Sequence, residues 1–458
     1  QYKLNGAWIF TDENHPGIWE AAKTVFMPRA GMALRVDDRT SLRVGYARYV
    51  LPTEYNFINA PFSGFENINF LEPPYLGFDA SQYPEAVLQG IPQASLIDPF
   101  PSNKPMFPPK GKGYGRYLGL GGANLLWFYQ NEARGVNERV NVSFQRQLPN
   151  QIVVDFTLFM NFGRDLSWTD NVNQMDPRLS YQYKSALAVT IPNPFYQYLT
   201  PDQFPGPSRN QARVTVGSLL RPYPQYGGLY EIGTPGRKER YTSYQFKVQR
   251  GFRNGYNFLF GYVYQREKAY EFFDDIAQYD DNFTYQESAS PRHRISTAGT
   301  YEFPFGKGRR FLGDANRAID AVFGGWQVVG VWYFNSGDFL RFGTMLANGD
   351  PVIPNRTPKR WFNTSVFAQQ PPYTPRSNPK QYEGLTGPSF WDMQGTLSKT
   401  FRVTERLKTE LKIAAYNLTN RLNRANPDTG VLSATFGQTL RQRTTVGRQM
   451  EFGLKILF

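Results

Sequence analysis

The chain has 458 residues, a formal net charge of +13, two histidines and no cysteine. The lack of cysteine excludes disulfide scaffolds, thiolate metal sites and thiol catalysis, and two distant histidines, His15 and His293, argue against a histidine-based metal site or triad. No stretch approaches about 18 consecutive apolar residues, which excludes a transmembrane helix but not a barrel strand, since such a strand needs only about 9–11 residues, half of them polar.

Alternation of apolar and polar residues with a period of two recurs along the chain and predicts about twelve strands, the first at Tyr2 to Phe10. Parity divides each strand into two faces, one for lipid and one for the lumen of a barrel. We expect these side chains to point outward: Ile152, Val154, Phe156, Phe246, Ile413, Phe452, Leu454 and Ile456. We expect these to point into the lumen: Asp155, Lys247, Glu410, Lys412, Glu451 and Lys455.

The connections between the strands are of two lengths. Short turns are predicted at residues 36–40, 148–150, 251–255 and 402–405, where Gly, Asn, Asp or Pro occur. Long connections are predicted at residues 52–136, 163–238, 267–290, 337–389 and 417–445, all on one side. Loops of this length are uncommon in compact soluble domains. The sequence therefore predicts an all-β fold, an antiparallel transmembrane β-barrel of the bacterial outer membrane with short periplasmic turns and long extracellular loops. A soluble sandwich or barrel is the alternative.

The last strand ends on an aromatic residue, in the sequence MEFGLKILF. A closed barrel has no edge, so such a strand can finish at the periplasmic rim. A C-terminal aromatic residue on an alternating strand resembles the signal that the barrel assembly machinery reads. The candidate signal residues are Phe452, Leu454, Ile456 and Phe458.

Six stretches, in order along the chain, resemble TonB-dependent outer-membrane transporters of the Oar-like group, whose complete members carry a carboxypeptidase-regulatory-like domain. They include FMPRAGMALRVDDRTSLRVGYARYVLP, YTSYQFKVQRGFRNGYNFLFGYVYQ, SPRHRISTAGTYEFPFGKGRRFL and FGGWQVVGVWYFNSGDFLRF. The resemblance runs from about Phe26 to Phe458. It implies a plug domain, contact with TonB and a barrel of about 22 strands.

Because no plug is recognised in it, residues 1–458 are expected to form the C-terminal portion of such a barrel. The missing N-terminal half and plug would then be partners, together with TonB acting through the plug, the barrel assembly machinery, outer-membrane lipid and lipopolysaccharide. An autonomous barrel of about twelve strands and an assembly with other chains are alternatives. Nucleic acid is not expected as a partner, because the basic residues are spread along the chain without a recognition motif.

The expected function is that of the barrel wall of a transporter for a substrate such as a siderophore, glycan or peptide. A structural or adhesive surface barrel that acts through its long loops is the first alternative, and a soluble β-rich carbohydrate-binding or hydrolytic protein is the second. No paired-carboxylate, Ser–His–Asp or metal constellation stands out, so no enzyme is predicted. The loops and plug would choose the substrate, which the sequence therefore does not specify.

One loop is rich in carboxylates, in the sequence FFDDIAQYDDN. Oxygen ligands suit Ca²⁺, and the weak candidate ligands are Asp274, Asp275, Asp280 and Asp281. Their spacing is not that of an EF-hand, and a solvated extracellular loop is the alternative interpretation. No other cofactor is expected.

Overall fold

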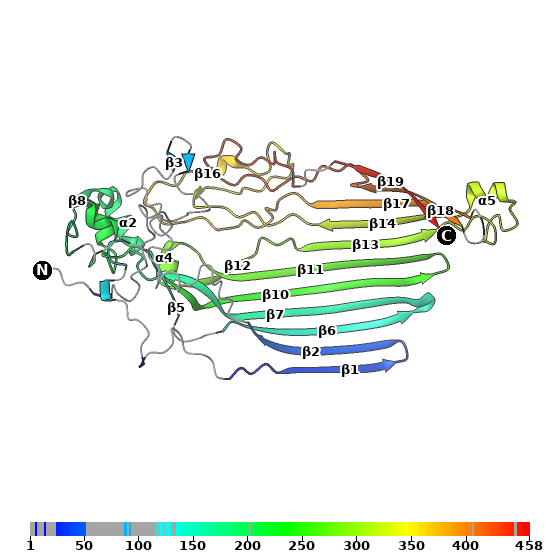
Figure 1. Ribbon diagram of the computed structural model, residues 1–458, viewed down its shortest axis with the longest axis horizontal. Helices are drawn as coiled ribbons and strands as arrows, with labels where there is room; N and C mark the ends of the chain where they lie inside the picture. The colour runs from blue at the N-terminus through cyan, green and yellow to red at the C-terminus, as the bar shows by residue number, and fades with distance from the viewer. Residues whose placement is uncertain are drawn as a thin grey trace.

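A large antiparallel sheet dominates the computed structural model (Figure 1). The structure describes residues 5–6, 13–14, 24–51, 87–88, 91–92, 115–117, 119–122, 124–129, 134–200, 203–204, 206–402, 404, 407–443 and 447–458. Eleven strands of this part follow one another as hydrogen-bonded neighbours, in the order β1-β2-β6-β7-β10-β11-β13-β14-β17-β18-β19, with β12 on β11 and β5 on β10. No helix among the described residues is long and apolar enough to cross a membrane.

The strands of the main sheet are β1 (Arg29–Asp37), β2 (Thr40–Val50), β5 (Leu125–Phe128), β6 (Val136–Leu148), β7 (Ile152–Asn171), β10 (Leu229–Arg253), β11 (Tyr256–Phe272), β12 (Phe283–Glu287), β13 (His293–Glu302), β14 (Trp326–Asn335), β17 (Phe390–Arg402), β18 (Lys408–Tyr416) and β19 (Gln449–Leu457). Small two-stranded sheets are formed by β3 (Val87–Leu88) with β4 (Ile91–Pro92), β8 (Thr190–Pro192) with β9 (Arg213–Thr215), and β15 (Leu346–Ala347) with β16 (Phe367–Ala368). The helices are α2 (Pro177–Tyr183), α3 (Val216–Leu219), α4 (Asp275–Tyr279) and α5 (Arg317–Phe323), with 3-10 turns η3 (Pro149–Gln151), η4 (Lys184–Ala188), η5 (Pro207–Asn210) and η6 (Thr364–Val366).

Eleven of the twelve predicted strands are present. The remaining predicted strand, the first in chain order at Tyr2 to Phe10, lies outside the described residues except for Asn5 and Gly6, which are not in a strand. The Asn5 carbonyl accepts a hydrogen bond from Gln225 Nε2 at 2.7 Å, within the connection between β7 and β10. The described path therefore begins among the long loops and ends, with β19, at the opposite end of the sheet (Figure 1).

The register of the ladder confirms that the two predicted sets of side chains lie on opposite faces. One row of directly paired residues crosses nine strands and is apolar throughout: Leu34, Leu42, Phe144, Phe156, Phe246, Tyr262, Ile295, Phe334 and Trp391. The adjacent row on the other face pairs Gln145 with Asp155 and Asp155 with Lys247. At the C-terminal end, Leu411 pairs with Leu454 and Glu410 with Lys455, in keeping with the same division.

Burial differs between the two faces of the sheet. On the polar face Ser243 is 0% exposed and its partner Gln265 is 4% exposed, whereas on the apolar face Tyr244 and Phe156 are 45% and 44% exposed. Side chains converge on the concave face of a curved sheet and splay on its convex face. At mid-strand the apolar face is therefore the more exposed one, which is in keeping with an outer face of a barrel wall in lipid.

Three of the predicted short turns, at residues 36–40, 148–150 and 251–255, lie at one end of the sheet, called here the turn end (Figure 1). The fourth, at residues 402–405, lies in part outside the described residues. Between β10 and β11, Asn254 and Gly255 have φ of 54° and 86°, the left-handed conformations of a type I′ hairpin turn, which asparagine and glycine adopt at little cost. The prediction that long connections occur on one side only is wrong. Residues 303–325, which include α5, join β13 to β14 and lie at the turn end.

The described pairings leave the two outer strands with one neighbour each. β1 pairs with β2, and β19 pairs with β18. Every residue of β1 is exposed, including Met32, Leu34 and Val36 at 50–59%. No self-closure of the sheet between β1 and β19 is seen among the strands that the structure describes.

The buried apolar cores lie in the long connections at the other end, called the loop end. One cluster belongs mainly to the connection between β7 and β10 and includes Phe195 and Phe204, which is 1% exposed. The second belongs to the connection between β14 and β17 and includes Leu340 and Phe362, which is 0% exposed. These loops are therefore folded units with their own packing, although the sequence predicts them as irregular.

Candidate functional site

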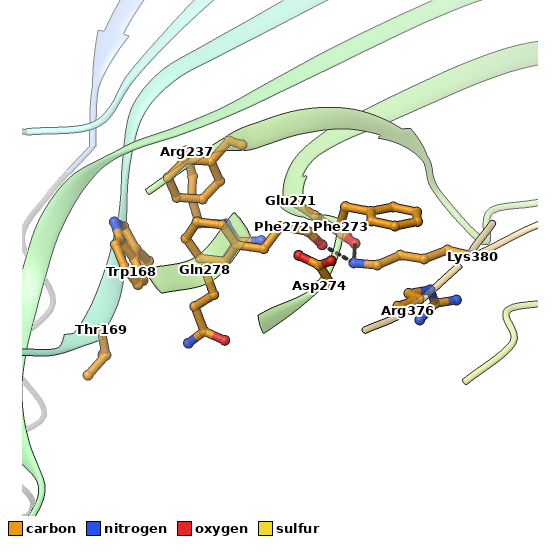
Figure 2. A pocket seen from close by; sticks show the side chains of 11 residues that line it. Trp168, Thr169, Arg237, Glu271, Phe272, Phe273, Asp274, Gln278, Arg376 and Lys380 are labelled. Atoms are coloured by element: carbon orange, nitrogen blue, oxygen red, sulfur yellow. Dashed lines mark hydrogen bonds and ion pairs between the residues drawn. The ribbon is translucent and has the colours of Figure 1, made fainter. Parts of the chain in front are cut away.

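A pocket of about 690 Å³ opens at the loop end, where β7, β10 and β11 extend beyond their shorter neighbours. Its lining comes from the ends of β7 and β11, from β10, from β12, from α4 and the segment before it, and from the connection between β14 and β17 (Figure 2). The lining residues are Trp168, Thr169, Arg237, Glu271, Phe272, Phe273, Asp274, Gln278, Phe283, Arg376 and Lys380. The volume is within the range of sites for small ligands, about 300–1,000 Å³.

One wall of the pocket is aromatic. The rings of Phe272 and Phe283, brought together by the pairing of β11 with β12, stack with centroids 4.0 Å apart. Trp168 meets Phe272 edge to face at 5.0 Å. Such packing fixes the orientation of the rings and presents flat apolar surface on a rigid support.

The opposite wall is charged, and Glu271 is its centre. Both guanidinium nitrogens of Arg341 donate to the Glu271 carboxylate, and Lys380 Nζ lies 3.6 Å from it. Burial alone raises the pKa of Glu271, but the hydrogen bonds and charges of Arg341 and Lys380 outweigh burial and hold this pKa below its usual value. Glu271 is therefore a fixed carboxylate that ties the end of β11 to the connection between β14 and β17.

Two further side chains of the lining have structural roles. Asp274 caps α4 by accepting a hydrogen bond from the Ala277 backbone at 2.8 Å. Arg376 donates to the carbonyls of Phe342 and Asn378 at 2.7 and 2.9 Å, and burial lowers its pKa. Both residues hold the rim of the pocket in shape.

The charges of the lining do not balance. Three cations, Arg237, Arg376 and Lys380, stand against two carboxylates, Glu271 and Asp274. Figure 2 shows an ion pair of Lys380 with Glu271 but none from Arg237 to the other lining residues. Within the described lining, Arg376 donates to backbone carbonyls and Lys380 pairs with Glu271, whereas no hydrogen bond or ion pair of Arg237 with another lining residue is seen.

Three of the four aspartates predicted as weak Ca²⁺ candidates, Asp274, Asp275 and Asp280, have other partners in the structure. Asp275 accepts a hydrogen bond from Tyr181 at 2.6 Å, and Asp280 forms an ion pair with Arg178. No group of three or more potential metal-ligating side chains is found within the described residues. Calcium binding stays a prediction, and it would have to displace these contacts.

Asp281 lies near a carboxylate that the sequence reading missed. Burial and the nearby charge of Asp281 raise the pKa of Asp170, at the end of β7, and burial together with Asp280 raises the pKa of Asp281. Asp170 directly follows the lining residue Thr169 on β7, and Asp281 lies three residues after the lining residue Gln278, beyond the end of α4.

The candidate assembly-signal residues occupy the apolar face of the last strand. Phe452 pairs with Ile413, Leu454 with Leu411 and Ile456 with Thr409, and Phe458 follows β19 and is fully exposed. Their role as a signal stays a prediction.

Of the pocket residues, only Asp274 was singled out from the sequence, as a weak Ca²⁺ candidate, and the pocket itself was not predicted. The lining residues come from distant segments, and Arg376 stands in PPYTPRSNP, which reads only as a rigid proline-rich loop. The one local signal was the FF doublet before Asp274, where aromatic residues stand next to carboxylates at a strand end.

Comparison with known proteins identifies the class. Residues 1–451 match a family model described as "Outer membrane beta barrel domain". The chain belongs to this family and is a β-barrel protein of the bacterial outer membrane, not a member of an enzyme family. In such barrels the short turns face the periplasm and the long loops face the outside, so the loop end is extracellular and the turn end periplasmic.

Among solved structures, the chain is similar to the outer membrane transporter YddB from Escherichia coli, with 10% identity, 92% of this chain and 39% of that chain covered, and a TM-score of 0.42. It is similar to the siderophore receptor PirA from Acinetobacter baumannii, with 10% identity, 94% and 41% covered, and a TM-score of 0.40. It is also similar to the ferripyoverdine receptor of Pseudomonas aeruginosa, with 9% identity, 93% and 32% covered, and a TM-score of 0.38. The chain thus spans well under half of their length. No curated protein matches it.

Proposed function

We propose that this chain forms part of the wall of a TonB-dependent outer-membrane transporter, which takes up a substrate such as a siderophore, glycan or peptide. The observation that carries the proposal is the open sheet, in which β1 and β19 each have one neighbour among the described strands. An unpaired backbone group in hydrocarbon costs several kcal/mol, so both edges need partners in the membrane. Eleven strands are half of the about 22 that the resemblance implies.

The other strands would come from polypeptide that pairs with the outer edges of β1 and β19, and the wider barrel would have room for a plug that contacts TonB. The polar face supports this arrangement, because the half-buried Asp155, Lys247 and Glu410 would line a lumen filled by protein and water. The six family-like stretches, in order along the chain, support it independently of the sheet.

The extracellular pocket is the proposed contact for the substrate. Its rigid aromatic wall suits a planar or sugar ring, and its excess of one cation suits a negatively charged group near Arg237. Because Glu271, Asp274 and Arg376 are engaged in holding the rim, recognition would depend chiefly on Arg237 and on Phe272.

Uptake by cells tests the proposal. Radiolabelled ferric siderophores, oligosaccharides and peptides are offered to cells that carry or lack the protein, with and without TonB. We expect uptake of one class that requires both the protein and TonB, and a reduction of about tenfold for Arg237→Ala, the equivalent of about 1.4 kcal/mol. Tyr373→Ala, on the extracellular loop between β14 and β17, is the matched control and should have no effect. Uptake that persists without TonB would contradict the proposal.

A structural or adhesive role is the second candidate, favoured by the folded extracellular connections. Each loop has an apolar cluster, with Phe204 at 1% and Phe362 at 0% exposure, and this packing gives the loops a defined surface to which a partner could bind. Loss of attachment of cells to surfaces on deletion of the protein, with no change in any TonB-dependent uptake, would favour this role over transport.

A further inference from the structure

The long periplasmic connection of residues 303–325 departs from the short turns at the same end of the sheet. It projects beyond the strand ends with α5 and is ordered by its own contacts (Figure 1). Phe305 and Phe311 form a bridge with ring centroids 5.6 Å apart, and Asp320, within α5, accepts a hydrogen bond from the Lys307 backbone at 2.6 Å. Asn316 caps α5 by accepting from Ile319 at 3.0 Å.

The end of α5 is attached to the lipid-facing side of the sheet. Trp326 Nε1 donates to the Val322 carbonyl at 2.9 Å, and Lys399 Nζ donates to the carbonyls of Val322 and Gly324. Trp326 and Lys399 are directly paired, on the parity of the apolar face that also contains Val328 and Leu397. The connection therefore meets the sheet on its apolar face at the turn end, next to where lipid headgroups would lie.

The surface of this connection combines exposed apolar side chains with positive charge. Six large apolar side chains are 39–59% exposed: Phe305, Phe311, Leu312, Ile319, Val322 and Phe323. Residues 303–325 carry an excess of two positive charges, because four basic residues, Lys307, Arg309, Arg310 and Arg317, outnumber the two acidic ones, Asp314 and Asp320. Exposed apolar residues beside basic ones are the composition of segments that lie in a membrane interface.

We propose that residues 303–325 form an interfacial anchor, which inserts Ile319, Val322 and Phe323 into the inner leaflet of the outer membrane and holds anionic phospholipid headgroups with its basic residues. The apolar side chains would continue the lipid-facing surface of β14 and β17 below the barrel rim. The inference concerns the seating of the barrel and does not depend on the transport proposal.

The absence of cysteine from residues 1–458 allows a direct test, because Val322→Cys creates a single thiol in this chain. The contacts of Val322 with Trp326 and Lys399 use its carbonyl, so this substitution keeps them. The thiol is labelled with an environment-sensitive fluorophore, and the protein is placed in vesicles of phosphatidylethanolamine and phosphatidylglycerol that contain lipids with a quencher near the headgroup. Phe246→Cys, on the lipid face, and Tyr373→Cys, on an extracellular loop, are the positive and negative controls.

We expect the Val322 label to be blue-shifted and quenched by the lipid, and the Tyr373 label to be unquenched. Combining the label with Lys307→Glu and Arg310→Glu should reduce the quenching in vesicles with phosphatidylglycerol. A Val322 label as unquenched as that at Tyr373 would overturn the proposal. Shielding that arises only after periplasmic proteins are added would also overturn it, because a protein would then cover this surface.

Discussion

Placing a charge on the apolar face tests the orientation of the sheet, and Phe156→Arg is the most informative substitution. Phe156 lies four residues above Ile152, the first residue of β7. With a rise of about 3.3 Å per residue and a strand tilt of about 40°, this is about 10 Å above the periplasmic rim, close to the middle of an apolar band about 25 Å tall. Its direct neighbours on the same face are Phe144 and Phe246, which offer the guanidinium no partner.

An arginine at mid-depth on the lipid face should lower the free energy of unfolding by about 2–4 kcal/mol. Thr157→Arg is the matched control, one residue further along β7 and on the opposite face. Thr157 Oγ1 donates to Asp155 at 2.9 Å and its paired neighbours are Ser143 and Gln245, so an arginine there meets water and a carboxylate. We expect this control to change stability by no more than about 0.5 kcal/mol.

The assay is reversible guanidinium unfolding in phospholipid vesicles, with the free energy obtained by linear extrapolation. The comparison of two adjacent positions removes differences in strand propensity and in depth. A larger loss for Thr157→Arg than for Phe156→Arg would refute the assignment of the faces.

Three further predictions concern the loops and the last strand. The pKa of Glu271 is lowered in the folded state, so its contribution to loop stability is present above its unfolded pKa of about 4.3 and is lost as the pH falls through the folded value. Protease resistance of the loop between β14 and β17 should therefore fall in that acidic range. The Glu271→Gln variant should have a protease resistance that does not depend on pH there. Phe458→Asp should reduce the amount of assembled barrel in the outer membrane more than it lowers the stability of assembled protein; unchanged levels would argue against the assembly signal. If Asp274, Asp275, Asp280 and Asp281 bind Ca²⁺, calorimetry should detect binding that Asp280→Asn weakens; absence of heat in the wild-type protein would remove the candidate.

The strands were predictable because each has one apolar and one polar face, and a period of two is visible in a single sequence. The Asn254–Gly255 turn was predictable for a similarly local reason, since few residues adopt its left-handed backbone. The register then joined the predicted parities into continuous rows, as with Phe156 and Phe246.

The connections were predicted less well because their structure depends on contacts between distant segments. The long connection of residues 303–325 was not predicted, because its order depends on contacts such as those of Asp320 with the Lys307 backbone and of Trp326 with the Val322 carbonyl. The pocket depends on Glu271 meeting Arg341 and Lys380 across 70 residues or more, and no local pattern contains that information.

The most direct test of the central claim, that this sheet is a wall of an outer-membrane barrel with its apolar face in lipid, is a spin-label scan along β7. Single cysteines replace each residue from 152 to 161 of this chain, whose residues 1–458 contain no cysteine, and the collision rates of the labels with oxygen and with a water-soluble nickel complex are measured in bilayers. The account predicts oxygen contact that peaks at positions 152, 154, 156, 158 and 160, and nickel contact that peaks, if at all, at the positions between them. Equal accessibility at all positions, or oxygen contact that peaks at Asp155 and Thr157, would contradict it.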